Sequence, residues 1–228
     1  MYIMESYNLF ISHLDNEIIK LLAIRQKYKI NSKNFKVYEL GGYNKEDILI
    51  SNIDNNIYIN ELKQTDYNHH YKIYEKLFNS NLIKKKENPN ITNLEELNLN
   101  RIIKQCYITL LYDLCDFGDD KYHEIACDLD IQILYKLSQR IHFGYEVIKY
   151  KYLNNKDLYN KLLACNNSSL VIHYLAESIK EPTYLENLMK ICNNHSINTI
   201  IVQGFYKFYI LPFTTEIQYS FLNKLRNI

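Results

Sequence analysis

The chain has 228 residues and a formal net charge of +1, and it contains only 5 Gly and 3 Pro. Its length suits one sizeable core, more readily as one domain than as two. The scarcity of turn-forming residues excludes a many-stranded sandwich or barrel and favours long helices. The small net charge does not suit a nucleic-acid-binding protein, which usually presents a basic stripe. We interpret the densest basic run, residues 84–86, as a solvated loop.

The cysteine and hydropathy patterns indicate where the protein works. Its 5 cysteines are scattered and include no C-x-x-C pair, which indicates free thiols in a reducing compartment rather than a disulfide framework or a zinc site. The first apolar stretch contains Glu5 and Asp15 and lacks a signal-peptide pattern. No apolar run approaches the roughly 18–20 residues that cross a bilayer. We therefore expect a cytoplasmic protein that binds no metal, no membrane and no nucleic acid.

Apolar residues recur at three- and four-residue steps from the first residues onward and predict a long helix over 5–28. Arg25 lies on its apolar stripe, and we interpret it as a buried ion-pair partner rather than a site residue. Two weaker helices are predicted over 46–63 and 68–80, followed by a polar link over 84–98. A further helix is predicted over 100–118, with Asn100 as the N-cap. Another is predicted to start between Ser178 and Pro182. The remaining helices are predicted over 128–153, 157–165, 168–176, 198–209 and 212–228. The sequence thus predicts an all-α, single-domain bundle of roughly ten helices spanning 1–228.

The helix predicted over 128–153 carries two cations on one face. Arg140 and Lys151 are eleven residues apart, which returns the second side chain to within about 20° of the first after a rise of roughly 16 Å. Gly144 lies between them on that face, where glycine costs up to about 1 kcal/mol relative to alanine. The spacing leaves two interpretations open. One is a clamp for a rigid ligand with separated negative charges, and the other is two salt bridges beside a close helix crossing.

Two further pairs of polar residues have four-residue spacing. Glu177 and Glu181 share a face if their helix is continuous. Glu181 either closes a capping box with Ser178 or accepts a hydrogen bond from a ligand hydroxyl. Thr214 and Gln218 lie on an otherwise apolar face, where buried polar groups need either a ligand or another helix as partner. None of these groups forms a nucleophile–base pair, so the set suits electrostatic and conformational catalysis without proton transfer.

The segment Leu137-Ser-Gln-Arg-Ile-His-Phe-Gly144, followed by Lys151, resembles the active-site helix of the helical chorismate mutases, particularly the eukaryotic branch. Weaker resemblances to the family's first helix, the turn after it and its final helix lie at 14–25, 37–39 and 210–218. The likeness covers about residues 5–40 and 98–228, whereas 43–97 is a divergent connecting region that looks shortened.

The resemblance implies a cofactor-free isomerase of aromatic amino acid biosynthesis that converts chorismate to prephenate by a unimolecular Claisen rearrangement. It implies that Arg140 binds one carboxylate and that Lys151 contacts the other carboxylate and the ether oxygen. It also implies roles for Glu181 as acceptor from the ring hydroxyl, Gln218 as donor to the ether oxygen and Thr214 as a carboxylate ligand. Glu177 stands where the family has Asn or Asp. Members of the family are typically homodimers.

Two departures from the family pattern stand out. The family supplies a further arginine from its first helix, at the position of Asn8 in this chain, which motivates a second hypothesis: a catalytically lapsed member that binds a dicarboxylate or serves in protein interactions. The regulatory site of the eukaryotic branch depends on a Gly-Ser pair before the active-site helix. Residues 122–125 lack that pair, and we expect no feedback control by aromatic amino acids.

Overall fold

All the regular secondary structure in the part of the chain that the structure describes is helical. This computed structural model describes residues 2–31, 99–165, 167–178 and 181–226. The helices predicted over 46–63 and 68–80, and the rest of the divergent region 43–97, lie outside the described residues. The residues that the structure describes contain no strand. The all-α prediction is confirmed.

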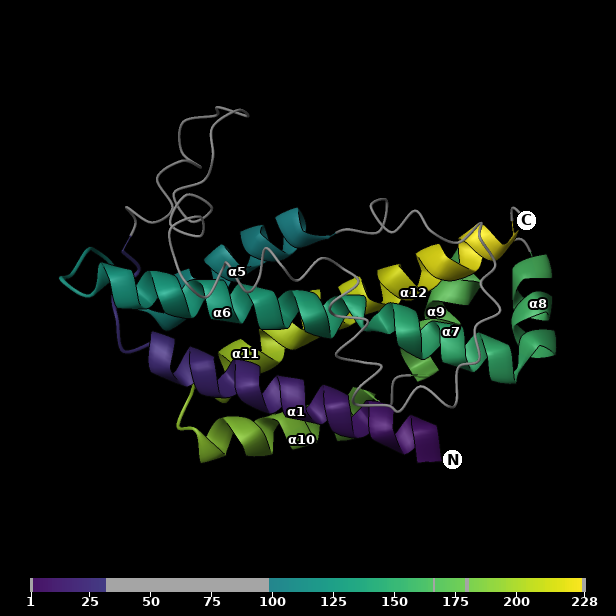
Figure 1. Cartoon of the computed structure of the whole chain (residues 1–228), viewed down its shortest axis with the longest axis horizontal. Helices are drawn as coiled ribbons and strands as arrows, with labels where there is room; N and C mark the ends of the chain where they lie inside the picture. Colours follow the sequence, from purple (N-terminus) through teal and green to yellow (C-terminus); the bar gives the residue numbers. More distant parts are fainter. Residues whose placement is uncertain (1, 32–98, 166, 179–180, 227–228) are drawn as a thin grey trace, which may run out of the picture.

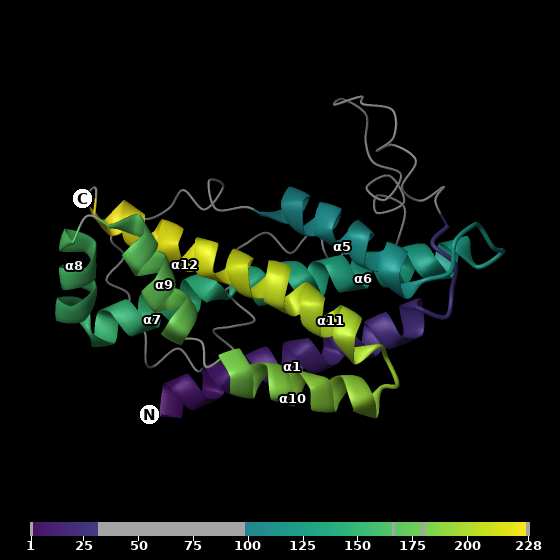
Figure 2. The same cartoon turned by 180° about the vertical axis from the view of Figure 1, so that it is seen from behind.

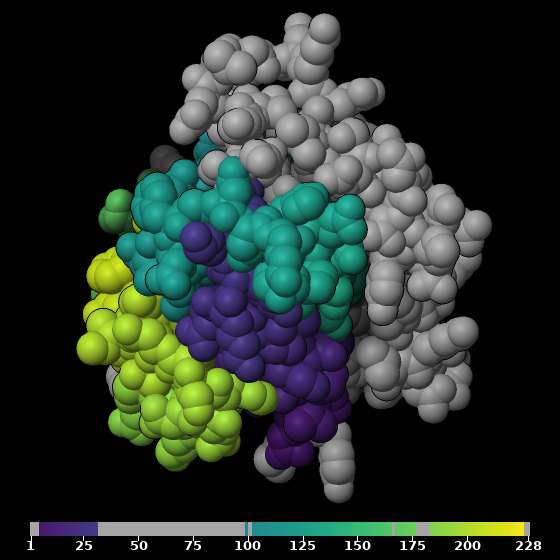
Figure 3. Space-filling view, turned by 90° about the vertical axis from the view of Figure 1, so that its left-hand side faces the viewer, coloured from purple at the N-terminus to yellow at the C-terminus, as the bar shows by residue number. Residues whose placement is uncertain are grey.

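The long helices run side by side along one axis (Figure 1). In chain order the elements are α1 (Tyr2–Arg25), α5 (Asn100–Leu114), α6 (His123–His142), α7 (Gly144–Asn154), α8 (Lys156–Ala164), α9 (Ser168–Ser178), α10 (Glu181–Asn194), α11 (Thr199–Phe205), the π-helical turn η4 (Tyr206–Ile210) and α12 (Leu211–Arg226). Seen from behind, α10 lies along α1, and α8 stands across the end of the bundle near the C-terminus (Figure 2). At the opposite end, the last turns of α1 lie between the α5–α6 segment and the α10–α11 segment (Figure 3). No helix in the described residues is both long and apolar enough to span a membrane.

The single helix predicted over 128–153 is two helices in the structure, and the prediction is wrong in this respect. The boundary falls at Phe143, directly before Gly144, a residue type of weak helix propensity. The backbone N–H of Phe143 still donates to the carbonyl of Gln139 at 3.0 Å, and Val147 N–H donates to Phe143 at 3.2 Å. The helical path is therefore nearly continuous, and the two cations stay about three turns apart along one rod.

The last part of the chain, residues 199–226, is also one helical path, broken only in its hydrogen-bond pattern. The sequence predicts a break between two helices, after residue 209 and before residue 212. The structure has the π-helical turn η4 there, in which the N–H of Leu211 donates to the carbonyl of Tyr206, five residues back. Pro212 follows directly. Proline has no N–H and its ring crowds the carbonyl four residues earlier, so a widened turn at this point removes the conflict.

The start of α5 corrects a smaller prediction. The helix begins at Asn100 as expected, but Leu99 occupies the N-cap position and makes no side-chain cap. The N–H of Leu99 instead donates to Nε2 of His142 at 3.2 Å. The helix also ends earlier than predicted, at Leu114 rather than near Gly118. The start of this helix is therefore held by a tertiary contact to α6.

Arg25 is a buried ion-pair partner, as predicted. Its Nε donates to Oδ1 of Asp130 on α6 at 2.6 Å, and both side chains are fully buried. The Tyr107 hydroxyl donates to the same oxygen at 2.5 Å. The terminal guanidinium nitrogens donate to the carbonyls of Tyr28, Lys29 and Ile30. Arg25 thereby joins α1, α5 and α6 and holds the chain where it leaves α1.

We predict that Arg25→Met lowers the free energy of unfolding by about 3–5 kcal/mol, because it leaves Asp130 buried without its cation. Burial already raises the pKa of Asp130 to about 6 despite Arg25, and loss of the arginine raises it further. The loss should be larger at pH 8 than at pH 5, since the lone carboxyl is protonated in the folded protein at low pH. The matched control is Lys136→Met, which breaks the partly exposed Lys136–Glu17 pair and should cost at most about 1 kcal/mol. Equal losses in urea denaturation of the two variants would contradict this assignment.

Candidate active site

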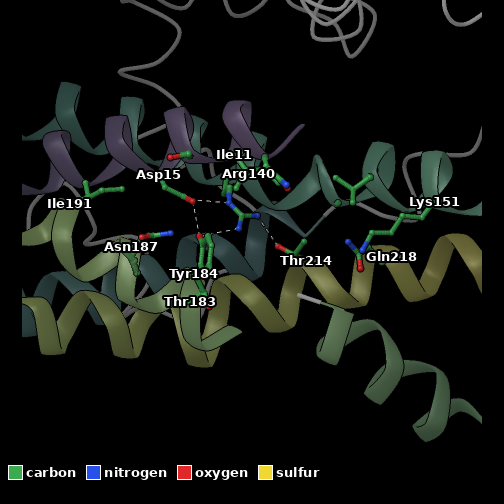
Figure 4. Close-up of a pocket in the computed structure, with 15 residues that line it drawn as sticks. Ile11, Asp15, Arg140, Lys151, Thr183, Tyr184, Asn187, Ile191, Thr214 and Gln218 are labelled. Carbon is green, nitrogen blue, oxygen red and sulfur yellow. Dashed lines mark hydrogen bonds and ion pairs between the residues drawn. The ribbon is translucent and has the colours of Figure 1, made fainter. Parts of the chain in front are cut away.

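A cavity of about 550 Å³ lies between α1, α6–α7, α10 and α12 (Figure 4). Five of the seven catalytic and binding residues predicted from the sequence line it together: Asn8, Arg140, Lys151, Thr214 and Gln218. They come from four helices and from both halves of the chain. Arg140 and Lys151 therefore line the same cavity.

Arg140 is buried in the wall of this cavity and makes three side-chain hydrogen bonds. Its Nε donates to Oδ1 of Asp15 at 3.0 Å, Nη2 to the Tyr184 hydroxyl at 3.1 Å, and Nη1 to Oγ1 of Thr214 at 3.4 Å. Burial by itself lowers the pKa of Arg140, but the oxygens of Tyr184 and Asp15 raise it above its ordinary value. The side chain stays a cation. It belongs to a salt bridge and also lines a pocket, so the salt-bridge interpretation is confirmed for Arg140, and the ligand clamp stays a prediction.

Asp15 and Tyr184 are the site residues that the sequence analysis missed. The Tyr184 hydroxyl donates to Oδ2 of Asp15 at 2.6 Å, and the Cζ atom of Arg140 lies 5.7 Å from the centre of the Tyr184 ring. One signal for Asp15 was present. It follows Leu14 within the apolar stretch of α1 and is only 1% exposed, and a carboxylate that is buried so deeply requires a partner.

Lys151 and Gln218 lie together at the other end of the cavity, where the lysine stem extends toward the glutamine amide (Figure 4). Burial lowers the pKa of Lys151 from its ordinary value. Gln218 is 2% exposed, and its side-chain oxygen is buried without a hydrogen-bond partner among the described residues. A buried amide in this condition is rare in a folded protein, and a bound ligand would complete its hydrogen bonds.

Gly144 allows α7 and α12 to cross closely. A Cβ atom at this position would lie 2.8 Å from Cγ2 of Thr214, 3.0 Å from the Thr214 carbonyl oxygen and 3.5 Å from Cγ of Gln218. The Thr214 hydroxyl donates to the carbonyl of Ile210 in η4 at 2.8 Å, which fixes its rotamer. Glycine at 144 therefore brings two polar residues of α12 up to the cavity wall.

The structure gives less detail for the other three predicted site residues, Asn8, Glu177 and Glu181. Asn8 lines the cavity and is exposed at its edge. The side chains of Glu177 and Glu181 lie outside the described residues. Their backbones belong to different helices, because α9 ends at Ser178 and α10 begins at Glu181. The condition for the predicted shared face, one continuous helix, is therefore not met.

The sequence is similar to those of chorismate mutases from fungi and plants. It is 30% identical over 142 residues to chorismate mutase of Saccharomyces cerevisiae, covering 56% of this chain and 55% of that protein. It is 28% identical over 142 residues to the Schizosaccharomyces pombe chorismate mutase, covering 55% and 56%. With chorismate mutase 2 of Petunia hybrida it shares 25% identity over 159 residues, covering 59% and 60%. The chain thus matches little more than half the length of these curated relatives, and no family model matches it.

Solved structures match the fold over nearly the whole chain. The Candida albicans chorismate mutase in complex with L-Trp superposes with a TM-score of 0.72 and 21% identity, covering 96% of this chain and 90% of that one. The chloroplast chorismate mutase of Zea mays gives a TM-score of 0.69 with 19% identity, covering 97% and 95%. Identities this low show a common fold alone.

We predict that Gly144→Ala disrupts the site through α12. The added methyl group meets the Thr214 backbone, and overpacking of this kind costs about 1–3 kcal/mol. Binding of an anionic ligand should weaken as well, because Thr214 and Gln218 move with the helix. Gly204→Ala in α11 is the control. A Cβ there meets nothing within 4 Å, so the change should be neutral or raise stability by up to about 1 kcal/mol. If both variants unfold at the same temperature as the parent protein and bind alike, the close crossing has no such role.

Proposed function

Since the chain belongs to the helical chorismate mutase family, in its eukaryotic branch, we propose that it is an isomerase that converts chorismate to prephenate without a cofactor. The observation that carries this proposal is the cavity in which Arg140, Lys151 and the buried amide of Gln218 meet. Such a cavity fits a small dicarboxylate with an ether oxygen between its charged ends.

The proposed reaction needs no acid, base or nucleophile. One carbon–oxygen bond of the ether breaks while one carbon–carbon bond forms, within a single substrate molecule. The protein has to hold the compact conformer and to stabilise the negative charge that develops on the ether oxygen. Positioned donors do both, because they need little reorganisation as the charge grows.

The proposed roles follow the places of the side chains. Arg140 binds one carboxylate, assisted by Thr214, whose hydroxyl oxygen lies 3.4 Å from its Nη1. Lys151 binds the other carboxylate and the ether oxygen, and Gln218 donates to that oxygen through its amide nitrogen. We propose that Glu181 accepts from the ring hydroxyl and that Glu177 is a further substrate-binding residue. Asn8 contacts the substrate from the edge of the cavity.

Asn8 also motivates the second candidate function. It stands where the family supplies an arginine, and a charge-assisted hydrogen bond contributes roughly 1.5–3 kcal/mol. Its loss corresponds to roughly a ten- to hundredfold lower rate. A protein that lost this contact could keep the cavity and bind a dicarboxylate without turnover, or serve in protein interactions.

The proposal includes two features of the protein's setting. We propose a cytoplasmic location, supported by the cysteines, because no disulfide joins any of the 5 in the structure. We also propose a homodimer, on the family resemblance. The expectation that aromatic amino acids do not control this chain stays a prediction.

We predict that the purified protein consumes added chorismate and forms prephenate, followed by absorbance and chromatography. Lys151→Met should lower kcat/KM at least about 100-fold with little change in stability, because one donor to the ether oxygen is lost. Arg140→Ala should abolish turnover, but it also leaves Asp15 buried without a cation, so the lysine variant is the cleaner test. Absence of turnover with tight binding of a bicyclic mimic of the transition state would favour the lapsed member. Absence of both would reject the proposal.

We predict a rate that is nearly flat from about pH 5 to 8, because the donor at position 218 is an amide that does not titrate. At higher pH the rate should fall as Lys151 loses its proton, earlier than for an exposed lysine because burial lowers its pKa. Gln218→Glu is the matched variant. A carboxyl group must be protonated to donate, so its rate should fall steadily as pH rises through its pKa. Identical pH profiles for the two proteins would show that residue 218 does not contact the ether oxygen.

A further inference from the structure

The ion pair between Arg140 and Asp15 has an unusual form. A guanidinium and a carboxylate usually pair through two parallel N–H···O hydrogen bonds. One of these is direct here, from Nε of Arg140 to Oδ1 of Asp15 at 3.0 Å. The second passes through a phenol. Nη2 donates to the Tyr184 hydroxyl at 3.1 Å, and that hydroxyl donates to Oδ2 of Asp15 at 2.6 Å. Figure 4 shows the resulting triangle in the cavity wall.

The position of the Tyr184 hydroxyl between Arg140 and Asp15 affects how many N–H donors of Arg140 remain for a ligand. A guanidinium has five N–H donors, and the described residues accept from three of them, one on each nitrogen. The other two belong to Nη1 and Nη2, the terminal nitrogens on the end of the side chain that lies in the cavity lining. A carboxylate bound directly to both Nε and Nη2 would lie closer to that end. Its negative charge would then compete with an arriving anion.

We propose that Tyr184 is a positioning residue whose hydroxyl keeps Asp15 from a second direct bond to Arg140 and so keeps the arginine available to a ligand carboxylate. The inference rests on the proposed function for the nature of that ligand, a small dicarboxylate. Asp15 and Arg140 are 1% and 3% exposed, and each needs the other while the cavity is empty. The phenol satisfies Oδ2 with a donor at the distance of a strong hydrogen bond without drawing the carboxylate toward Nη2.

The surroundings of Tyr184 suit this task. Its ring lies against the guanidinium, 5.7 Å from Cζ to the ring centre, so the hydroxyl cannot swing away without loss of that contact. Burial holds its pKa well above the ordinary value, so the hydroxyl remains a donor at any working pH. Donor toward Asp15 and acceptor from Arg140, it fills both roles that the relay requires.

Tyr184→Phe tests the inference, because it removes the hydroxyl and keeps the ring. The readouts are the Kd of the bicyclic dicarboxylate mimic by calorimetry, the KM and kcat with chorismate, and the Tm. We expect Kd and KM to rise about tenfold or more, with a smaller change in kcat and a nearly unchanged Tm. Tyr159→Phe makes the same chemical change at a buried tyrosine that packs with α7–α9 and α12, away from the cavity, and should leave Kd and KM as they are.

The double variant Asp15→Asn/Tyr184→Phe separates positioning from mere packing. Without a carboxylate there is no charge to occupy Nη2, so binding should recover relative to Tyr184→Phe alone. A structural role predicts the reverse, with the double variant binding no better than the single one, and that result would overturn the inference. An unchanged Kd for Tyr184→Phe would overturn it as well, and this arm decides even if the double variant does not fold. Absence of both binding and turnover in the parent protein would instead contradict the proposed function.

Discussion

Two buried ion pairs of opposite polarity fix α1 against α6, and the rest of the structure depends on this register. Asp15 of α1 pairs with Arg140 of α6, and Arg25 of α1 pairs with Asp130 of α6. The partners are ten residues apart on each helix, a rise of about 15 Å, so the two pairs match only when the helices run antiparallel in this one alignment. A slip by one turn would leave four buried charges without partners, at a cost of several kcal/mol each. Apolar packing alone would tolerate such a slip far more readily.

That register places the cations of the site, and the last helix brings the neutral groups to them. Gly144 lets α12 approach the α6–α7 rod, while Pro212 and the π-helical turn before it set the face that α12 presents. Thr214 and Gln218 reach the cavity through these two backbone features. Gly144 and Pro212 have no functional groups in their own side chains. The site therefore depends on a missing Cβ atom and a missing N–H group as much as on its charged side chains.

The sequence allowed much of this to be predicted. Periodicity placed Arg140 and Lys151 on one face and identified Arg25 as a buried partner, because both are properties of a single helix. It missed the break at Phe143 and the continuity through η4, which depend on how helices pack. It also missed Tyr184, whose partner Asp15 is 169 residues away in the chain. No local sequence pattern shows that two side chains this far apart in the chain form a hydrogen bond.

The pairing of Arg140 with Asp15 also sets the long-range behaviour of the cavity. Among the described side chains that line it, Arg140 and Lys151 are cations and Asp15 is an anion, which gives a local sum of one positive charge. A dianion that enters reverses this sign rather than cancelling it. Attraction from a distance is therefore weak, and ionic strength should alter the encounter rate far less than it would for two uncompensated cations. For the proposed dianionic ligand, selectivity at this cavity would then come from contact geometry after the ligand has arrived.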